Sequence, residues 1–204
     1  IGEAAGCTDQ GLRAVALGVH AGRVSQSTEV VAIGAYAGSN AQGNKSVAIG
    51  SNAGRVSQGA TSVAVGVSAG STGQGNLAVA VGDSAGRLDQ GTHAVAVGYK
   101  AGCTGQSNGC VAIGFQSACN AQGSYAVAIG VDSGRDDQGN FCVAIGREAG
   151  ETNQHNNTVV INAQGTALNT NGTSRFFVKK IRLNSGALQW SSGTGEVYAN
   201  TSDD

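Results

Sequence analysis

Short apolar runs recur along the chain at a constant interval. The tetrapeptide Val-Ala-Ile-Gly, or a close variant of it, starts at Val15 and again at every sixteenth residue up to Val159. A second position of the repeat is always glutamine: Gln10, Gln26, Gln42, Gln58, Gln74, Gln90, Gln106, Gln122, Gln138 and Gln154. A constant period without insertions indicates a solenoid, because coils of equal length keep equivalent residues in register as they stack.

Each 16-residue unit is too short for two helices and a turn. Its short β-branched runs end at glycine, which is typical of strands and the turns between them. We therefore expect an all-β fold, a parallel β-roll solenoid of ten 16-residue coils over residues 1–162. With about 4.8 Å between coils, such a roll would be about 48 Å long.

The Val-Ala-Ile strand is apolar on both of its faces. Val15 and Leu17 point to one side, whereas Ala16 and the small residue Ala14 point to the other, since side chains alternate along a strand. One face can line the thin interior of the coil, and the other needs a second surface to cover it. We expect identical copies of the chain to supply that surface. The alternative is that a face of small alanines tolerates solvent.

Composition and charge exclude several other classes of protein. The chain has 34 glycines, no proline and a formal net charge of −1. Collagen needs proline and glycine at every third position, and glycine at this density destabilises helices. A net charge near zero does not indicate the basic surface that binds nucleic acid. The sequence also has no run of about 18 apolar residues that could cross a membrane. We expect no nucleic-acid partner, no membrane insertion and no cofactor.

The repeat resembles a known family. The segments Ser46-Val47-Ala48-Ile49-Gly50-Ser51-Asn52-Ala53 and Ser62-Val63-Ala64-Val65-Gly66-Val67-Ser68-Ala69 resemble the YadA-like head repeats of trimeric autotransporter adhesins. The resemblance covers Ile1 to about Asn162. It implies a left-handed parallel β-roll that assembles as a homotrimer and binds host surfaces. The family's repeat is often shorter, and its neck motif and membrane anchor are not visible in this sequence.

The C-terminal part of the chain departs from the repeat. Residues 163–174 are rich in Gly, Asn and Thr and predict a linker. Residues 175–204 predict a small β module with a strand at 175–181 and a hairpin around 191–195. The segments 177–182, 194–197 and 201–204 resemble the junction that precedes endosialidase-type intramolecular chaperone domains of fibre proteins. This resemblance implies that Ser202 marks a processing junction, and such fibres are common in phages and large DNA viruses, including algal ones.

Two aromatic pairs are candidate ligand contacts. Tyr99 and Phe115 share one position of successive coils, and Tyr125 and Phe141 share another, with His93 two coils before Tyr125. Charged residues occupy the same positions elsewhere, so these side chains should face outward, where aromatic rings suit sugar or protein contact. The alternative is stacking between coils that supports the roll. For the glutamines we expect a structural ladder of amides along the interior; the alternative is a polar ligand groove.

Cysteines and titratable residues provide weaker signals. Cys103 and Cys119 lie on adjacent coils, within disulfide range, whereas Cys110 and Cys142 lie two coils apart, which is too far. The alternative is that these cysteines are small buried substitutes for alanine. The histidines do not cluster, and the acidic residues fall at variable corners, so we expect neither a metal site nor a catalytic centre.

These observations predict a non-enzymatic trimeric fibre or adhesin head on the surface of a virion. It would attach the particle to a cell-wall glycan or a surface protein of the host cell. One alternative is the head of a trimeric autotransporter adhesin on a bacterial cell surface. Another is a purely structural fibre spacer. An ice-binding solenoid would need a regular threonine array, and here threonine is scattered.

Overall fold

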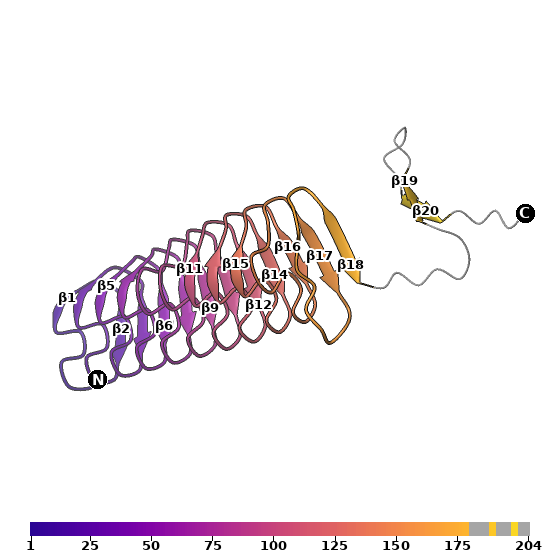
Figure 1. Ribbon diagram of the computed structural model, residues 1–204. Coiled ribbons are helices and arrows are strands. Elements are labelled where there is room, and N and C mark those ends of the chain that lie inside the picture. The colour runs from indigo at the N-terminus through magenta and orange to yellow at the C-terminus, as the bar shows by residue number, and fades with distance from the viewer. Residues whose placement is uncertain (180–187, 191–196, 200–204) are drawn as a thin grey trace, which may run out of the picture.

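The computed structural model describes residues 1–179, 188–190 and 197–199. Its strands stack into a long parallel solenoid (Figure 1), and the described residues contain no helix. The N-terminus lies at one end of the rod and β18 at the other. The expected all-β solenoid with 16 residues per coil is confirmed.

One long sheet runs the whole length of the rod. Its eleven strands pair in parallel. They are β2 (Val15–Leu17), β4 (Val31–Ile33), β6 (Val47–Ile49), β8 (Val63–Val65), β9 (Val79–Val81), β10 (Val95–Val97), β12 (Val111–Ile113), β14 (Val127–Ile129), β16 (Val143–Ile145), β17 (Val159–Asn162) and β18 (Phe176–Lys179). From β2 to β17 each residue pairs with the residue sixteen positions on, as Val31 pairs with Val47. The period of the sequence is therefore the register of the sheet.

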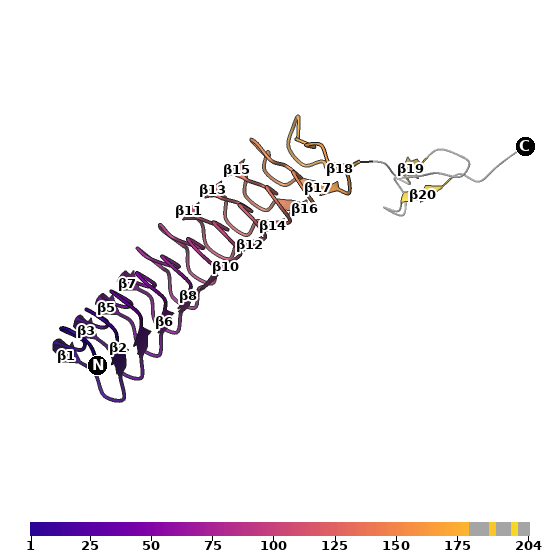
Figure 2. The same cartoon turned by 90° about the horizontal axis from the view of Figure 1, so that it is seen from below.

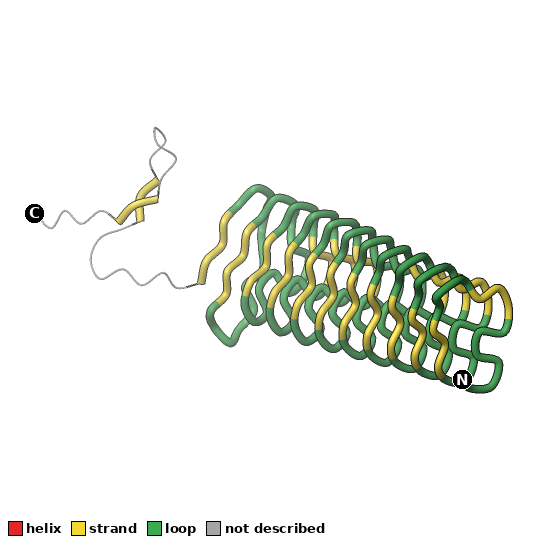
Figure 3. The backbone as a smooth tube through the Cα atoms, turned by 180° about the vertical axis from the view of Figure 1, so that it is seen from behind, coloured by secondary structure: helices red, strands yellow, loops and turns green. Residues whose placement is uncertain are grey.

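A second row of strands forms another side of each coil (Figure 2). Its strands are β1 (Thr8–Gln10), β3 (Val24–Gln26), β5 (Asn40–Gln42), β7 (Val56–Gln58), β11 (Thr104–Gln106), β13 (Asn120–Gln122) and β15 (Asp136–Gln138). Single parallel bridges through Thr72 and Leu88 connect β7 to β11. Short strands alternate with turns around the coils (Figure 3), and at Thr72 and Leu88 the second row has only the single bridges.

The long sheet extends one coil further than we expected. Residues 163–174, which the composition suggested to be a linker, lead round from β17 to β18 and bond to the coil before them. Gly150 N donates to Leu168 O at 2.8 Å, and Leu168 N donates to Glu148 O at 3.1 Å. Phe176 pairs with Val159, a step of seventeen residues where the other coils take sixteen. The solenoid thus has an additional, slightly longer coil that no longer carries the repeat signature.

The far C-terminal residues are described only in part. Strands β19 (Leu188–Trp190) and β20 (Val197–Ala199) pair in antiparallel fashion, with Gln189 opposite Tyr198. The loop of the expected hairpin and Ser202 lie outside the described residues.

The interior of the solenoid is lined by very small side chains. Fourteen fully buried alanines form one continuous cluster, among them Ala32 and Ala48 from the middle of their strands. Near the C-terminal end Val160 replaces this alanine, and Leu168 and Phe177 pack beside it. The alanine face of the Val-Ala-Ile strand is therefore the inner one. The alternative of solvent-exposed alanines is wrong for these coils, and it is the larger Val, Leu and Ile side chains that point outward.

Left-handed backbone at the corners explains the glycine content. Gly50, directly after β6, has φ +125°, and a Cβ there would lie 2.5 Å from the carbonyl oxygen of Gly66. Neither the conformation nor the space tolerates a side chain. Other corners have positive φ without glycine, for example Thr61 at +57° and Tyr125 at +58°. Glycine is thus concentrated where the neighbouring coil approaches most closely.

Candidate binding surfaces

The outer face of the long sheet is an unbroken apolar stripe. Each of its eleven strands presents two apolar side chains outward, so the apolar stripe consists of Val15, Leu17, Val31, Ile33, Val47, Ile49, Val63, Val65, Val79, Val81, Val95, Val97, Val111, Ile113, Val127, Ile129, Val143, Ile145, Val159, Ile161, Phe176 and Val178. Several are strongly exposed, from Ile161 at 36% to Phe176 at 62%. A contiguous apolar surface of this length, about 50 Å for eleven strands, is typical of an interaction site.

The sequence did not reveal which face of this strand is the outer one. Alternation predicts that the faces differ, but both are apolar, so the hydrophobic pattern alone cannot orient them. The signal that distinguishes them is volume. Every copy of the central position from Ala16 to Ala144 is alanine, whereas the flanking positions hold Val, Ile or Leu. The smaller set lines the narrow interior, and near the C-terminal end Val160 takes the place of alanine.

The ten glutamines lie along the second row of strands and, except at the N-terminal end, point into the interior. Gln26 to Gln154 are at most 2% exposed, whereas Gln10 in the first coil is exposed. Each interior amide donates to the carbonyl oxygen of the first valine of the apolar tetrapeptide eleven residues before it, as Gln106 Nε2 does to Val95 O at 2.9 Å. The glutamines therefore connect the two rows of strands across the coil.

Successive amides also bond to each other. Gln90 Nε2 donates to Gln106 Oε1 at 3.1 Å, Gln106 Nε2 to Gln122 Oε1 at 3.0 Å, and Gln122 Nε2 to Gln138 Oε1 at 3.0 Å. The chain of amides runs unbroken from Gln74 to Gln154. It is interrupted at Gln58, whose Oε1 is buried without a partner. The Gln side chains thus form an internal ladder, and their buried, bonded amides are not offered to an external ligand.

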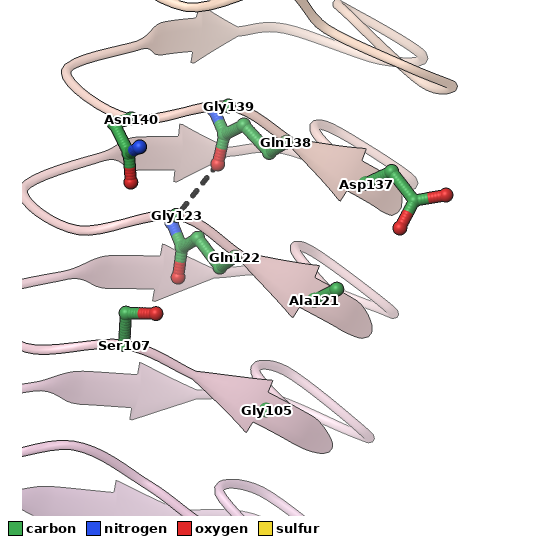
Figure 4. A pocket seen from close by; sticks show the side chains of 9 residues that line it. All are labelled: Gly105, Ser107, Ala121, Gln122, Gly123, Asp137, Gln138, Gly139 and Asn140. Carbon is green, nitrogen blue, oxygen red and sulfur yellow. Dashed lines mark hydrogen bonds between the residues drawn. The ribbon is translucent and has the colours of Figure 1, made fainter.

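A shallow polar groove follows the second row of strands on the outside. Figure 4 shows one hollow in it, about 300 Å³ in volume, where Asp137 points to the side of its strand opposite to Gln138. Hollows of about 460 and 320 Å³ lie at equivalent positions toward either end of the rod. Small residues such as Gly123 and Gly139 make the hollow. At Gly139 a Cβ would meet the backbone of the next coil, 2.7 Å from Gln154 O.

The predicted aromatic contacts form two stacked pairs. The rings of Tyr99 and Phe115 are 5.2 Å apart with 21° between their planes, and those of Tyr125 and Phe141 are 5.5 Å apart with 12°. All four side chains are exposed, Tyr125 and Phe141 at about 60%. Tyr125 also lies over Gly109 of the preceding coil, because a Cβ on Gly109 would be 2.8 Å from its ring.

His93 is exposed, but Gly109 separates it by one coil from Tyr125, and it forms no ring contact in the described part of the chain. A third ring pair, which the sequence reasoning missed, joins His20 and Tyr36, with centroids 5.0 Å apart. These two residues share one position of successive coils, so the 16-residue register was the signal that could have found them.

One cluster of charges lies on the outer surface near β15. Arg135 Nη1 is 2.9 Å from Glu151 Oε1, and Arg135 Nε is 2.9 Å from Asp136 Oδ2. Partial burial alone would raise the pKa of Asp136, but hydrogen bonds from Asn120 and Arg135, together with the charge of Arg135, lower it. The hydrogen bond to Asp136 raises the pKa of Arg135 in turn. These side chains lie half-buried at a corner of the roll, with one guanidinium held between carboxylates.

The cysteines are free in the structure. Cys110 and Cys142 point inward, where their thiols donate to Gly123 O at 2.8 Å and to His155 O at 2.9 Å. Burial raises the pKa of the Cys110 thiol, as expected for a small buried side chain. Cys103 and Cys119 face a hollow at another corner and are described below. No three His, Cys, Asp or Glu side chains within residues 1–179 are grouped so that they could hold a metal ion.

The fold defines the class of protein as a parallel β-solenoid, a rod in which each coil contacts only its neighbours. No family model matches the chain, no curated protein matches it, and no solved structure matches it. None of the described elements is a helix that could span a membrane.

Proposed function

We propose that this chain forms the head of a homotrimeric surface fibre that binds a cell-wall glycan or a surface protein of a host cell. The observation that carries the proposal is the apolar stripe. Twenty-two outward positions on eleven strands are apolar without one polar interruption. A monomer in water would leave this entire stripe hydrated, and covering it with other copies would bury it.

Self-association through this stripe fits the shape of the molecule. From β2 to β17 every coil has sixteen residues, so the stripe is regular and its partner surface must be equally long and regular. A second and third copy of the same rod meet that requirement over the whole length. Three copies around one axis would place the apolar stripes at the centre and leave the polar groove and the aromatic pairs outside.

The outer corners are the part of the coil that varies. They carry the exposed pairs Tyr99 with Phe115 and Tyr125 with Phe141, and rings on a polar surface suit contact with sugars and proteins. The YadA-like repeat and the chaperone-type junction with its processing position at Ser202 support a fibre on a virion. A bacterial surface adhesin remains the alternative source of the same architecture.

Two measurements test the proposal. Light scattering of the purified chain should give the mass of a trimer, and the trimer should be retained on host cell walls or on a glycan array. Replacing Tyr99, Phe115, Tyr125 and Phe141 with serine should weaken retention at least about tenfold, the loss of about 1.4 kcal/mol from stacked contacts. The matched control replaces Tyr36, which is similarly exposed on a different coil. A monomeric mass would overturn the trimer.

A purely structural spacer is the second candidate. The stacking of the aromatic rings favours the spacer, because the two rings of each pair contact each other and so already have a structural role within the chain. A trimer that none of the tested walls or glycans retains would support the spacer. If the serine variant were retained as strongly as the parent, the binding site would lie elsewhere than at these rings.

A further inference from the structure

Two cysteines lie side by side at a corner of the roll that neither the apolar stripe nor the aromatic pairs occupy. Thr104 pairs with Asn120 between β11 and β13, so Cys103 and Cys119, the residues just before them, are neighbours in successive coils. Both are free and nearly buried, at 5% and 9% exposure. Both line the same surface hollow of about 480 Å³.

Two basic side chains share this hollow. Arg87 occupies the same position as Cys103 one coil earlier, and Lys100 precedes Cys103 by three residues. The other side chains that line the hollow are neutral. Within residues 1–179 neither Arg87 nor Lys100 forms an ion pair, unlike Arg135 at the same position further along the rod. The hollow therefore combines two thiols with a net positive charge.

The two thiols differ in acidity. A hydrogen bond from Cys119 lowers the pKa of Cys103 to about 5 against the effect of burial, with further help from the Arg87 guanidinium and Thr104. The same hydrogen bond, together with burial and the negative charge of Cys103, raises the pKa of Cys119. The lowered pKa favours the thiolate form of Cys103 and the raised pKa favours the thiol form of Cys119, as expected for an attacking and a resolving cysteine.

We propose that Cys103 and Cys119 form a thiol–disulfide exchange site, which closes to a disulfide between two coils of one chain on meeting a small anionic disulfide such as oxidised glutathione. The Cys103 thiolate attacks one sulfur of the small disulfide, whose S–S bond breaks, and the released thiolate takes a proton from water. Cys119 then loses its proton and attacks Cys103 Sγ, releasing the second small thiol. Two protein thiols lose two electrons and two protons, and the small disulfide is reduced to two thiols.

The geometry of stacked coils suits a bond that forms and reopens. Coils in register hold equivalent Cα atoms about 4.8 Å apart, inside the range that disulfides span. Parallel side chains keep their Cβ atoms about equally far apart, which exceeds the mean of roughly 3.8 Å in relaxed disulfides. A mild reductant should therefore reopen the bridge. Arg87 and Lys100 supply the cations that hold the carboxylates of the small disulfide.

The experiment uses the full chain with Cys7→Ser, which removes the exposed thiol. After incubation with oxidised glutathione at neutral pH, this parent should lose the mass of two hydrogens. Peptide mapping without reductant should link the peptides of Cys103 and Cys119. The variant Cys119→Ser keeps a hydroxyl donor but cannot resolve, so it should accumulate one glutathione on Cys103. Cys103→Ser should gain an adduct at least about tenfold more slowly, because it lacks the thiolate.

Arg87 provides a second, independent test. In the Cys119→Ser background, Arg87→Gln should slow alkylation of Cys103 by iodoacetamide at pH 6, and Arg87→Lys should restore it. A parent that keeps both thiols free, or that holds a stable glutathione adduct without bridging, would overturn the proposal. Equal adduct rates in the two serine variants would do the same. Circular dichroism checks that the variants fold. Peptide mapping of the parent tests for the link between Cys103 and Cys119 even if a variant does not fold. The outcome is independent of whether the chain forms a fibre.

Discussion

The two rows of strands are built by the same repeat, yet their outer faces differ completely. The long sheet presents only Val, Leu, Ile and Phe outward. The second row presents a changing set that includes Thr104, Asn120 and Asp136. On the inside each row is nearly constant, with alanine repeating along the long sheet and glutamine along the second row. The inner residues therefore keep the coil constant, and the outer residues distinguish an apolar surface, which we propose is covered by other copies, from a polar one that can vary in water.

The sharpest way to break this comparison is to place charge on the apolar stripe. Ile113→Asp combined with Ile129→Asp should abolish the proposed trimer, weakening association by about 100-fold or more, because each copy would bury two unpaired carboxylates. Sedimentation or light scattering against concentration measures the shift.

The control puts a single added carboxylate on the second row. Asn153 lies on the exposed outer side of the coil, so Asn153→Asp should leave the mass of the oligomer unchanged. If both variants kept the mass of the parent, the apolar stripe would not be the interface.

The second prediction concerns the corners beside the long sheet. Gly98 follows β10 with φ +126°, and a Cβ there would lie 2.5 Å from Gly114 O. Gly98→Ala should lower the free energy of unfolding by about 3 kcal/mol or more, because both the backbone conformation and the contact are unfavourable. Chemical denaturation measures the loss.

Gly105 in the second row is the control for this substitution. Its φ is +66°, and the nearest atom to an added Cβ would be Ala121 Cα at 3.8 Å. Gly105→Ala should cost about 1 kcal/mol at most, since Ala121 itself adopts φ +52° at the equivalent position. Equal losses at the two glycines would contradict the view that close approach of coils dictates glycine at the end of the long-sheet strands.

The third prediction, with the smallest expected effect, compares two glutamines of the interior ladder that form different numbers of hydrogen bonds. Gln106 bonds to both neighbouring amides and to Val95 O, whereas Gln58 bonds only to Val47 O. Gln106→Met should cost about 2 kcal/mol and Gln58→Met about 1 kcal/mol, because methionine fills a similar volume but makes no hydrogen bond. Thermal unfolding distinguishes them. Equal costs would mean that the amide-to-amide bonds add nothing beyond the bond across the coil.

Much of the fold could be predicted because repetition is itself a structural constraint. The 16-residue period fixed the coil length, and with it the pairing of Val31 with Val47 and of Gln26 with Gln42. The same register placed the aromatic pairs and the two cysteines on neighbouring coils. The additional coil at 163–174 could not be predicted from the repeat. Its residues have lost the signature, and it forms because the last sheet edge offers free N–H and C=O groups to the chain that follows.

The sequence by itself determined the period, the strands and the register, because stacking equal coils has one solution. Only the tertiary structure decided which face of the Val-Ala-Ile strand is inside. Both faces are apolar, so the choice rests on volume: most of the narrow interior holds alanine and the glutamine ladder, and Val160 takes the place of alanine near the C-terminal end. The register already placed Arg87 beside Cys103, but only the structure could bring Lys100, from another position of the repeat, to the thiols of Cys103 and Cys119. That arrangement depends on how the backbone turns at the corner and brings side chains from different positions of the repeat to one hollow.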